Sequence, residues 1–255
     1  MEPPLLECRN VRKDYGALAA VDGVDLTVKA GETIGIGGPN GAGKTTFFDL
    51  ISGLTPHSGG EVLFQGKSIS RVSAHRLLPL GMARTFQVSS GFTSLSVMQN
   101  MLVSIIYGSG EERPGLTISR AHRQRASEQL ERFGLSHLAN VDVAEIPALA
   151  RKKLMVATAV AHDPKLLLLD EPVGGLVPSE IDDFIEMVLE LRSSGICIVF
   201  IEHVMRFLMT VAERALIMHQ GKLIYDGTPA GIAHDVTVKS VYLGSEADKL
   251  QEGAL

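Results

Sequence analysis

The sequence of 255 residues predicts an α/β fold with a mostly parallel sheet. In its second half, continuously apolar segments such as KLLLLD (165–170) and ICIVFIEH (196–203) alternate with helical segments. Strands of this composition are covered on both faces, as in parallel sheets flanked by helices. The composition, 45% apolar with 26 glycines, is that of a globular protein. No repeat with a period of about 20 to 50 residues is visible.

The first part of the chain is expected to supply an antiparallel layer and one strand of the parallel sheet. Residues 5–11 and 24–28 read as strands that pair in an antiparallel hairpin layer. TIGIGG (33–38) is expected to be a buried strand that leads into a glycine-rich loop, and a helix is expected over 44–54. A short strand pair (EVLFQGKSI) and the extended segment ARTFQ follow.

The chain changes character after ARTFQ and becomes helical from about residue 95 to 160, with a polar, Arg-rich segment at its centre. We therefore expect one domain of residues 1–255, with an α/β core from 1–87 and 164–255 and a helical subdomain from 88–163. The segment GSGEERPG (108–115) has no apolar period and is expected to be an exposed connection.

Charge and composition exclude several functions. The net charge is −5 and both signs are interspersed, so neither a nucleic-acid-binding patch nor a polybasic anchor is expected. No apolar run reaches the length of about 18 residues that spans a bilayer, and the N-terminus lacks a leader pattern, which favours a cytoplasmic location. Cys8 and Cys197 are far apart and are expected to have no disulfide or metal role, and Cys197, inside ICIVF, is expected to be a buried thiol.

GPNGAGKTT (38–46) has the spacing G-x-x-x-x-G-K-T between an apolar strand and a helix. Glycines let backbone N–H groups surround phosphates, and the helix N-terminus adds partial positive charge. Lys44 is expected to reach the β and γ phosphates and the Thr45 hydroxyl to bind Mg²⁺. A chance glycine-rich turn is the alternative, which the flanking strand and helix disfavour. The predicted nucleotide-binding residues of the loop are Gly38, Asn40, Gly41, Gly43, Lys44, Thr45 and Thr46.

KLLLLDEP places two carboxylates at the end of a predicted strand. Asp170 is expected at the carboxyl edge of the sheet, where Mg²⁺ and its waters would sit beside the nucleotide. Glu171 points elsewhere and can act as the general base that polarises the attacking water. Alone, the pair could be an acidic helix start before Pro172, but the phosphate loop in the same chain favours the catalytic interpretation.

The motifs GPNGAGKTT, ARTFQ, LLLLDEP and IEHVM, in this order, resemble those of ABC-transporter ATPases over nearly the whole chain. IEHVMRFLMTVAERALIMHQGKLIYDGTP and the closing VYLGSE are most similar to the branched-chain amino-acid (Liv-type) importer ATPases. The resemblance implies a P-loop NTPase core of the ABC ATPase type that hydrolyses ATP with Mg²⁺ and powers import of branched-chain amino acids or a related small polar solute. It implies permease subunits, a second ATPase subunit and, indirectly, a periplasmic solute-binding protein as partners, on the inner face of the plasma membrane and without nucleic acid.

The same resemblance assigns three further residues. Gln87, at the end of ARTFQ, is the lid-loop glutamine that contacts Mg²⁺ or the attacking water. His203 is the switch histidine at the γ-phosphate, and Tyr15 is the ring that stacks on adenine. Their structural alternatives are a polar strand end, a structural histidine and a packing aromatic. The catalytic candidates are thus Glu171, His203 and Gln87, and the candidate Mg²⁺ ligands are Thr45, Gln87 and, through water, Asp170.

The sequence departs from the family in two segments. ABC ATPases carry L-S-G-G-Q or L-P-Y-G-Q before the strand with the second carboxylate, where this chain has Ile146-Pro147-Ala148-Leu149-Ala150. In the family, that segment opens a helix whose N–H groups and serine hydroxyl bind the γ-phosphate held by the opposite subunit. Here Leu149 adds bulk and Pro147 has no N–H to donate. Val177 stands where the family has Asp or Asn and cannot make their hydrogen bonds.

These departures lead to two hypotheses. In the first, the chain pairs with a different ATPase subunit, and its phosphate loop and Glu171 work against that partner's intact signature. In the second, it forms a homodimer that hydrolyses ATP poorly. The alternative function is a nucleotide-binding regulatory subunit with little hydrolysis, which the degenerate signature favours and Glu171 and His203 disfavour. ABC proteins of DNA repair and translation are disfavoured, because they have either long coiled-coil insertions or two cassettes in one chain. Neither arrangement fits a sequence of 255 residues.

Overall fold

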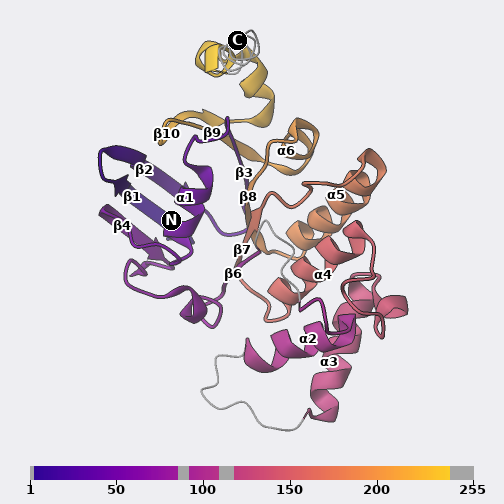
Figure 1. Ribbon diagram of the computed structural model, residues 1–255. Helices are drawn as coiled ribbons and strands as arrows, with labels where there is room; N and C mark the ends of the chain where they lie inside the picture. Colours follow the sequence, from indigo (N-terminus) through magenta and orange to yellow (C-terminus); the bar gives the residue numbers. More distant parts are fainter. Residues whose placement is uncertain (1–2, 86–91, 109–117, 242–255) are drawn as a thin grey trace. The chain divides into compact units, whose positions relative to one another are not determined.

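A computed structural model of the chain describes residues 3–85, 92–108 and 118–241 (Figure 1). The chain packs into two compact units, which are described separately. The first unit is formed by Met1–Ser73 together with Cys197–Leu255, and the second by Ala74–Ile196. The subdomain boundaries expected at residues 88 and 163 stay a prediction. The segment 108–115 lies almost entirely outside the described residues.

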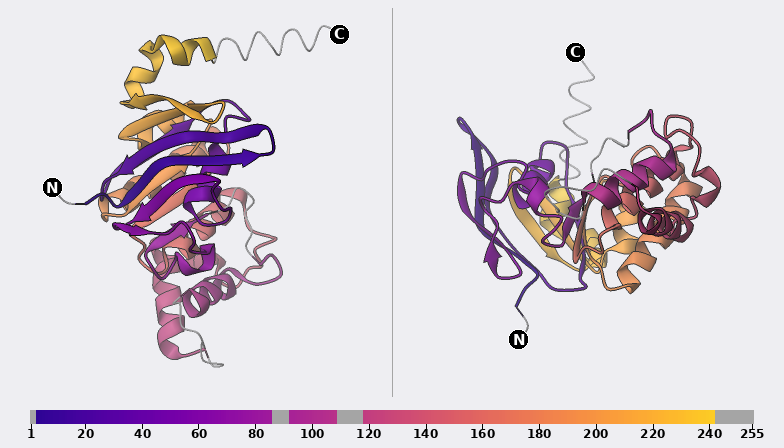
Figure 2. Two further views of the ribbon diagram at one scale, coloured as in Figure 1. Left: turned by 90° about the vertical axis from the view of Figure 1, so that its left-hand side faces the viewer. Right: turned by 90° about the horizontal axis from the view of Figure 1, so that it is seen from below.

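One layer of the first unit is an antiparallel sheet, as expected from the sequence. Its strands follow the order β2-β1-β4-β5 and lie side by side in Figure 2. Buried Leu6, Cys8 and Val11 form the inner side of β1, and the register shifts between Cys8 and Val11 because the strand bulges there. The strands are β1 (Leu6–Tyr15), β2 (Leu18–Val28), β4 (Gly59–Phe64) and β5 (Lys67–Ser68).

The parallel strands of the first unit carry the chain into the predicted phosphate loop. β3 (Thr33–Gly37) lies between β8 (Cys197–Ile201) and β9 (Arg214–His219) and runs parallel to both. β10 (Lys222–Gly227) pairs with β9 in the antiparallel direction. Every residue of β3 and β8 is buried, which explains their continuous apolar sequence.

Helices cover these strands with aromatic side chains. α1 (Lys44–Ile51) buries Phe47 and Phe48 fully. α6 (Met205–Val211) sets Phe207 edge-on against Phe200 of β8, with ring centroids 5.0 Å apart. A 3-10 helix over Pro229–His234 follows β10. The helix expected over 44–54 thus ends three residues early, where Ser52 closes it through backbone bonds.

The second unit contains a pair of parallel strands and a group of helices. β6 (Met82–Arg84) pairs with β7 (Leu166–Asp170), whose residues are all buried. Capping boxes at Ser96 and Ser119 start two of the helices. The helices are α2 (Val97–Tyr107), α3 (Arg120–Arg132), α4 (Ala148–Val160) and α5 (Pro178–Ser193), with 3-10 turns at Ala74–Arg76 and Ser136–Leu138.

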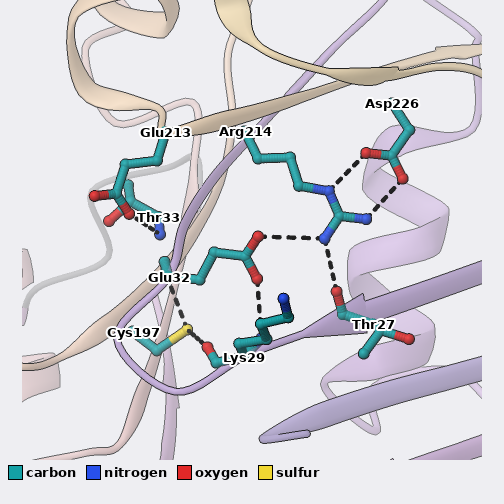
Figure 3. Close-up of polar contacts among 8 residues, drawn as sticks. All are labelled: Thr27, Lys29, Glu32, Thr33, Cys197, Glu213, Arg214 and Asp226. Atoms are coloured by element: carbon teal, nitrogen blue, oxygen red, sulfur yellow. Dashed lines mark hydrogen bonds and ion pairs between the residues drawn. The ribbon is translucent and has the colours of Figure 1, made fainter.

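A cluster of polar groups, here the amino-end cluster, ties together the beginnings of β3, β8 and β9 (Figure 3). Its centre is Arg214, which donates to both carboxylate oxygens of Asp226 at 2.6 Å. Arg214 also donates to the Thr27 carbonyl at 2.9 Å and to Glu32 at 3.2 Å. The hydrogen bond to Asp226 raises the pKa of Arg214 further above its ordinary range. The members are Thr27, Lys29, Glu32, Thr33, Cys197, Glu213, Arg214 and Asp226.

The remaining members of the amino-end cluster bond to backbone groups. Glu213 accepts the Thr33 N–H at 3.1 Å, and Glu32 accepts the Lys29 N–H at 2.9 Å. The Cys197 thiol lies 3.0 Å from the Glu32 carbonyl oxygen. Burial raises the pKa of Cys197 to about 12, so the thiol stays protonated. Cys197 and Cys8 are both free, buried thiols in the structure.

Candidate nucleotide site

The predicted phosphate loop connects β3 to α1 and depends on glycine at two positions. Gly38 and Gly43 have φ angles of 139° and 98°. A Cβ on Gly38 would clash with the Met218 carbonyl oxygen, and one on Gly43 would clash with that of Ala20. The loop therefore rests directly on the backbones of β9 and β2, and only glycine fits there without strain. The sequence predicted a curled glycine loop at this place, and the structure contains one.

The loop holds the Lys44 ammonium close to its own carbonyl oxygens and leaves several polar side chains exposed. Lys44 is 7% exposed, and its Nζ donates to the carbonyl oxygens of Gly38 at 2.8 Å and Pro39 at 2.9 Å. Its ammonium is therefore held over the loop. Asn40 and Thr45 are exposed, and Thr46 is half-buried. No side chain caps the N-terminus of α1, and the first turn of that helix contains no acidic residue. This helix end therefore favours an anion.

His203 shares a sheet edge with the phosphate loop. β3 and β8 run in the same direction with Ile36 opposite Ile201, so both strands end at that edge. His203 follows two residues after β8, and its side chain is 59% exposed. The structure thus brings together, within the first unit, the loop and the histidine that sequence reasoning assigned to one site. The contact of His203 with a γ-phosphate stays a prediction.

Sequence reasoning missed Glu202, which lies directly before His203. This residue is 0% exposed, and its Oε2 accepts the backbone N–H groups of His203 at 2.9 Å and Val204 at 3.0 Å. The same oxygen lies 3.7 Å from Nδ1 of the His203 ring. A glutamate at the end of an otherwise apolar strand was the available signal, because a buried carboxylate requires partners.

Tyr15 lies at the end of β1, opposite Leu18 across the hairpin. The Tyr15 residue is 53% exposed, and the ammonium of Lys13 lies 5.0 Å from the centroid of its ring. A cation at this distance stabilises an exposed ring by about 0.5 to 1 kcal/mol and restrains its orientation. Tyr15 is therefore an accessible, partly ordered aromatic surface, while its stacking on adenine stays a prediction.

The two predicted carboxylates lie in the second unit. Asp170 is the last residue of β7 and is 2% exposed. Its Oδ2 accepts a hydrogen bond from Nη2 of Arg84 at 2.8 Å, in an ion pair whose side chains are 3% and 7% exposed. Sequence reasoning did not name Arg84, although an arginine in the short buried strand before TFQ indicates a carboxylate partner. The pair fixes one oxygen of Asp170.

Glu171 begins a sharp change of direction after β7. Its φ angle is 44°, a left-handed value that costs a residue other than glycine about 1 to 3 kcal/mol. Two groups hold its carbonyl oxygen, the backbone N–H of Gly174 at 3.2 Å and Nζ of Lys152 at 3.2 Å. Lys152 lies on α4 and is 7% exposed. The signature helix is thus bonded to the backbone of the predicted general base.

The degenerate signature segment forms the start of α4, as the sequence predicted for a helix here. Pro147 is the N-cap, with φ of −58° and ψ of 158°, and no side chain caps this end. Ile146 is buried, whereas Pro147 and Ala148 are exposed. Val177 is likewise 56% exposed before α5, and its N–H donates to Glu180 at 3.0 Å. The exposed surface at both points is apolar.

Gln87 and most of the segment VYLGSE lie outside the described residues. Within the described part of the chain, no group of three or more His, Cys, Asp or Glu side chains could hold a metal ion. The predicted Mg²⁺ ligands suit that ion by their chemistry, because the hydroxyl of Thr45 in the first unit and the carboxylate of Asp170 in the second unit are each hard oxygen donors. The phosphate loop also suits a phosphate chain, because glycine at positions 38 and 43 allows its backbone to curl.

Comparison with known proteins gives a consistent result. The family model described as ABC transporter matches residues 21–174. The lipopolysaccharide export system ATP-binding protein LptB of Haemophilus influenzae is 34% identical over 242 residues, covering 95% of this chain and 98% of that protein. The high-affinity branched-chain amino acid transport ATP-binding protein BraF of Pseudomonas aeruginosa is 31% identical over 253 residues, covering 96% and 99%.

Solved structures agree with these relatives. The ADP conformation of MJ1267, an ATP-binding cassette of an ABC transporter, superposes with a TM-score of 0.87 at 28% identity, covering 94% of this chain and 99% of that one. A nucleotide-free ATP-binding cassette from an ABC transporter gives 0.86 at 27% identity, covering 94% and 98%. Among the described residues of the present chain, no helix combines the length and apolarity needed to cross a membrane. These likenesses confirm the predicted fold class.

Proposed function

This chain belongs to the ABC transporter family as an ATP-hydrolysing subunit, and we propose that it works as the competent half of an asymmetric ATPase pair. In this proposal the pair drives permease subunits on the inner face of the plasma membrane. The supporting observation is the contrast between a complete phosphate loop and a signature segment, Ile146 to Ala150, without the glycine and glutamine of the family's motif. The chain can bind a nucleotide itself but offers its partner few donors.

Each residue of the proposed site has its own role in nucleotide binding or hydrolysis. The loop N–H groups and Lys44 bind the β and γ phosphates, and His203 contacts the γ-phosphate from the adjacent strand end. Mg²⁺, held by Thr45, Asp170 and Gln87, would neutralise charge on the phosphates. Glu171 accepts a proton from the attacking water, and its left-handed backbone turns it out of the strand direction. Tyr15 stacks on the adenine.

The asymmetry follows from the start of α4. A helix N-terminus binds phosphate through its N–H groups and nearby polar side chains, and this segment lacks the hydroxyl, both glycines and the glutamine of the L-S-G-G-Q signature. Leu149 is half-buried where close approach of the backbone to a phosphate requires a small residue. We therefore assign the signature that completes this chain's own site to a companion ATPase subunit with an intact segment. The homodimer is the alternative arrangement.

For the transported solute we propose branched-chain amino acids or a related small polar solute. Support comes from the C-terminal half of the sequence and from the relatives named for branched-chain amino-acid transport. Lipopolysaccharide export is the second candidate, because the LptB proteins match this chain with slightly higher identity. Uptake of labelled leucine into vesicles carrying the complete transporter separates the two.

The decisive experiment uses the complex as it exists in cells. A tagged chain is purified from detergent-solubilised membranes, its partners are identified by mass spectrometry, and ATP turnover is measured. We expect permease subunits and a second ATPase to be recovered, and Glu171→Gln to lower kcat by about 10²- to 10⁴-fold. Glu186→Gln, an exposed carboxylate on α5, is the matched control and should retain full turnover.

Two results would contradict the asymmetric pair. One is recovery of this chain as the sole ATPase, with turnover that rises when Pro147→Ser and Leu149→Gly are combined; it would favour the homodimer. The other is normal turnover of the Glu171→Gln complex, which would show that this chain binds nucleotide without hydrolysing it and would favour the regulatory alternative.

A further inference from the structure

We infer that Glu202 is a positioning residue for ATP hydrolysis, because its buried carboxylate holds His203 in place at the edge of the phosphate loop. The inference rests on the proposed role of His203 and extends it to a neighbour that contacts no nucleotide. Three observations carry it, namely the burial of Glu202, its bonds to the backbone and its place beside the histidine ring.

The burial of Glu202 is the first observation. The side chain is 0% exposed, although glutamate is almost never fully buried without partners. Placing an ionisable group in this position costs free energy that an apolar residue at the end of β8 would not cost. A glutamate here therefore indicates that the bonds it makes are needed.

The second observation is the pattern of those bonds. A single oxygen, Oε2, accepts both the His203 N–H at 2.9 Å and the Val204 N–H at 3.0 Å. α6 begins one residue later at Met205 without any other side-chain cap. The carboxylate thus defines the turn between β8 and α6, and with it the direction in which the Cα–Cβ bond of His203 points.

The third observation connects this turn to the phosphate loop. The N–H of Glu202 donates to the Ile36 carbonyl oxygen on β3 at 3.2 Å, and Gly38 begins the loop two residues further on. Oε2 lies 3.7 Å from Nδ1 of His203, so this edge of the ring is turned toward Glu202. Nε2, on the opposite side of the ring, is the nitrogen left for a phosphate.

The test is a double-mutant cycle on the complete transporter with Glu202→Leu and His203→Ala. Leucine has similar size but no acceptor, so kcat should fall by about 10- to 100-fold, as for other residues that orient a functional histidine. The Kd for MgATP should stay within about twofold, because the loop glycines and Lys44 are unchanged. In the His203→Ala background, Glu202→Leu should have no further effect on kcat, since a positioned group that is absent cannot be misplaced.

Glu202→Gln is the conservative control. Its amide oxygen can still accept both backbone N–H groups, so we expect kcat to recover to near the wild-type value. Thermal unfolding of each variant reports folding. Should Glu202→Leu not fold, Glu202→Met takes its place, because methionine is closer in length to glutamate and lacks a carboxylate to accept the two N–H groups, and the same loss with the same coupling is expected.

The outcomes separate this inference from the proposed function. If Glu202→Leu lowered kcat equally in the wild-type and His203→Ala backgrounds, the inference that Glu202 positions His203 would be wrong. Glu202 would then be a general structural residue. Unchanged kcat for the folded Leu or Met variant would also overturn it. Full activity of His203→Ala alone would instead contradict the proposed role of the histidine.

Discussion

The two ends of β3 show how one strand can serve stability at one end and chemistry at the other. At its amino end, the amino-end cluster pairs charged side chains with one another and with backbone groups, as between Arg214 and Asp226 (Figure 3). At its carboxyl end, glycines bring the backbone into close contact with neighbouring strands and no carboxylate lies in the first turn of α1.

The difference teaches how to distinguish a structural polar cluster from a binding site. In the amino-end cluster, the charged side chains of Glu32, Glu213, Arg214 and Asp226 bond to protein groups, so no ligand is needed to satisfy them. In the phosphate loop, the backbone itself is arranged for an anion, and Lys44 is held by carbonyl oxygens that it can leave when a phosphate arrives. Substitutions at the two ends should therefore change different measurements.

The largest effect is expected at the carboxyl end. Lys44→Met removes the ammonium but keeps an unbranched side chain of similar length. A charge-assisted bond to a phosphate contributes about 1.5 to 3 kcal/mol. The Kd for MgATP should therefore rise by about 10- to 100-fold. Isothermal titration calorimetry on the purified chain measures this change.

Lys153→Met is the matched control for Lys44→Met, since Lys153 is a half-buried lysine on α4 of the second unit, outside the loop. Equal affinity for MgATP in wild type and Lys153→Met, with a loss for Lys44→Met, is the expected pattern. A Lys44→Met chain that binds MgATP as tightly as wild type would remove the distinction between the two ends.

The second effect is expected at the amino end and concerns stability. Arg214→Met removes the centre of the amino-end cluster and leaves Asp226 and Glu32 without their shared partner. Because the Arg214 side chain is 27% exposed, we expect the free energy of unfolding to fall by about 2 kcal/mol, less than the 3 to 5 kcal/mol lost on breaking a fully buried pair. Urea unfolding gives the value, and affinity for MgATP should not change.

Arg9→Met serves as the comparison for Arg214→Met. Arg9 also pairs with a carboxylate, Glu7, but its side chain is 56% exposed, so its loss should leave the free energy of unfolding nearly unchanged. If both variants were equally stable, or if Arg214→Met weakened nucleotide binding, the amino-end cluster would not be the purely structural element described above.

The smallest effect concerns the thiol of the amino-end cluster. Burial raises the pKa of Cys197 from 9.0 to about 12, so between pH 8 and 10 the unfolded chain loses this proton and the folded chain keeps it. The stability contributed by the thiol is therefore complete below pH 8 and falls as the pH rises. We expect the free energy of unfolding to drop by about 1.4 kcal/mol more in wild type than in Cys197→Ala over this interval.

Urea unfolding at both pH values measures the difference between the two chains, and the buried thiol of Cys8 cancels because it is present in each. Identical slopes with pH in wild type and Cys197→Ala would mean that the thiol ionises as easily in the folded chain as in the unfolded one.

The sequence was most informative where a single residue type is required. The glycine spacing predicted the loop, and the apolar runs predicted β3, β7 and β8, because only a strand buried on both faces is so uniformly apolar. The ends of elements were less predictable. α1 ends at Ile51 and β1 extends to Tyr15, since tertiary contacts rather than local sequence decide where these elements stop.

Partners of the site residues were the least predictable part. Arg84 bonds to Asp170, and Lys152 bonds to the Glu171 carbonyl oxygen. The two residues of each pair are far apart in the sequence, so no local pattern could assign these pairs. Glu202 lies next to His203 in sequence, yet its role depends on burial, which one glutamate beside a histidine does not reveal. The resemblance to a family named the reacting groups but not the groups that hold them.

The degenerate signature segment, Ile146 to Ala150, also bears on the energetics of transport. In the proposed pair, this chain's signature does not complete a second hydrolytic site, so each cycle of the assembly consumes one nucleotide. The steepest solute gradient that the transporter can sustain is then limited by the free energy of a single phosphoanhydride cleavage. The degenerate signature segment would thus lower the steepest gradient that the transporter can sustain and would also lower the number of ATP molecules consumed in each cycle.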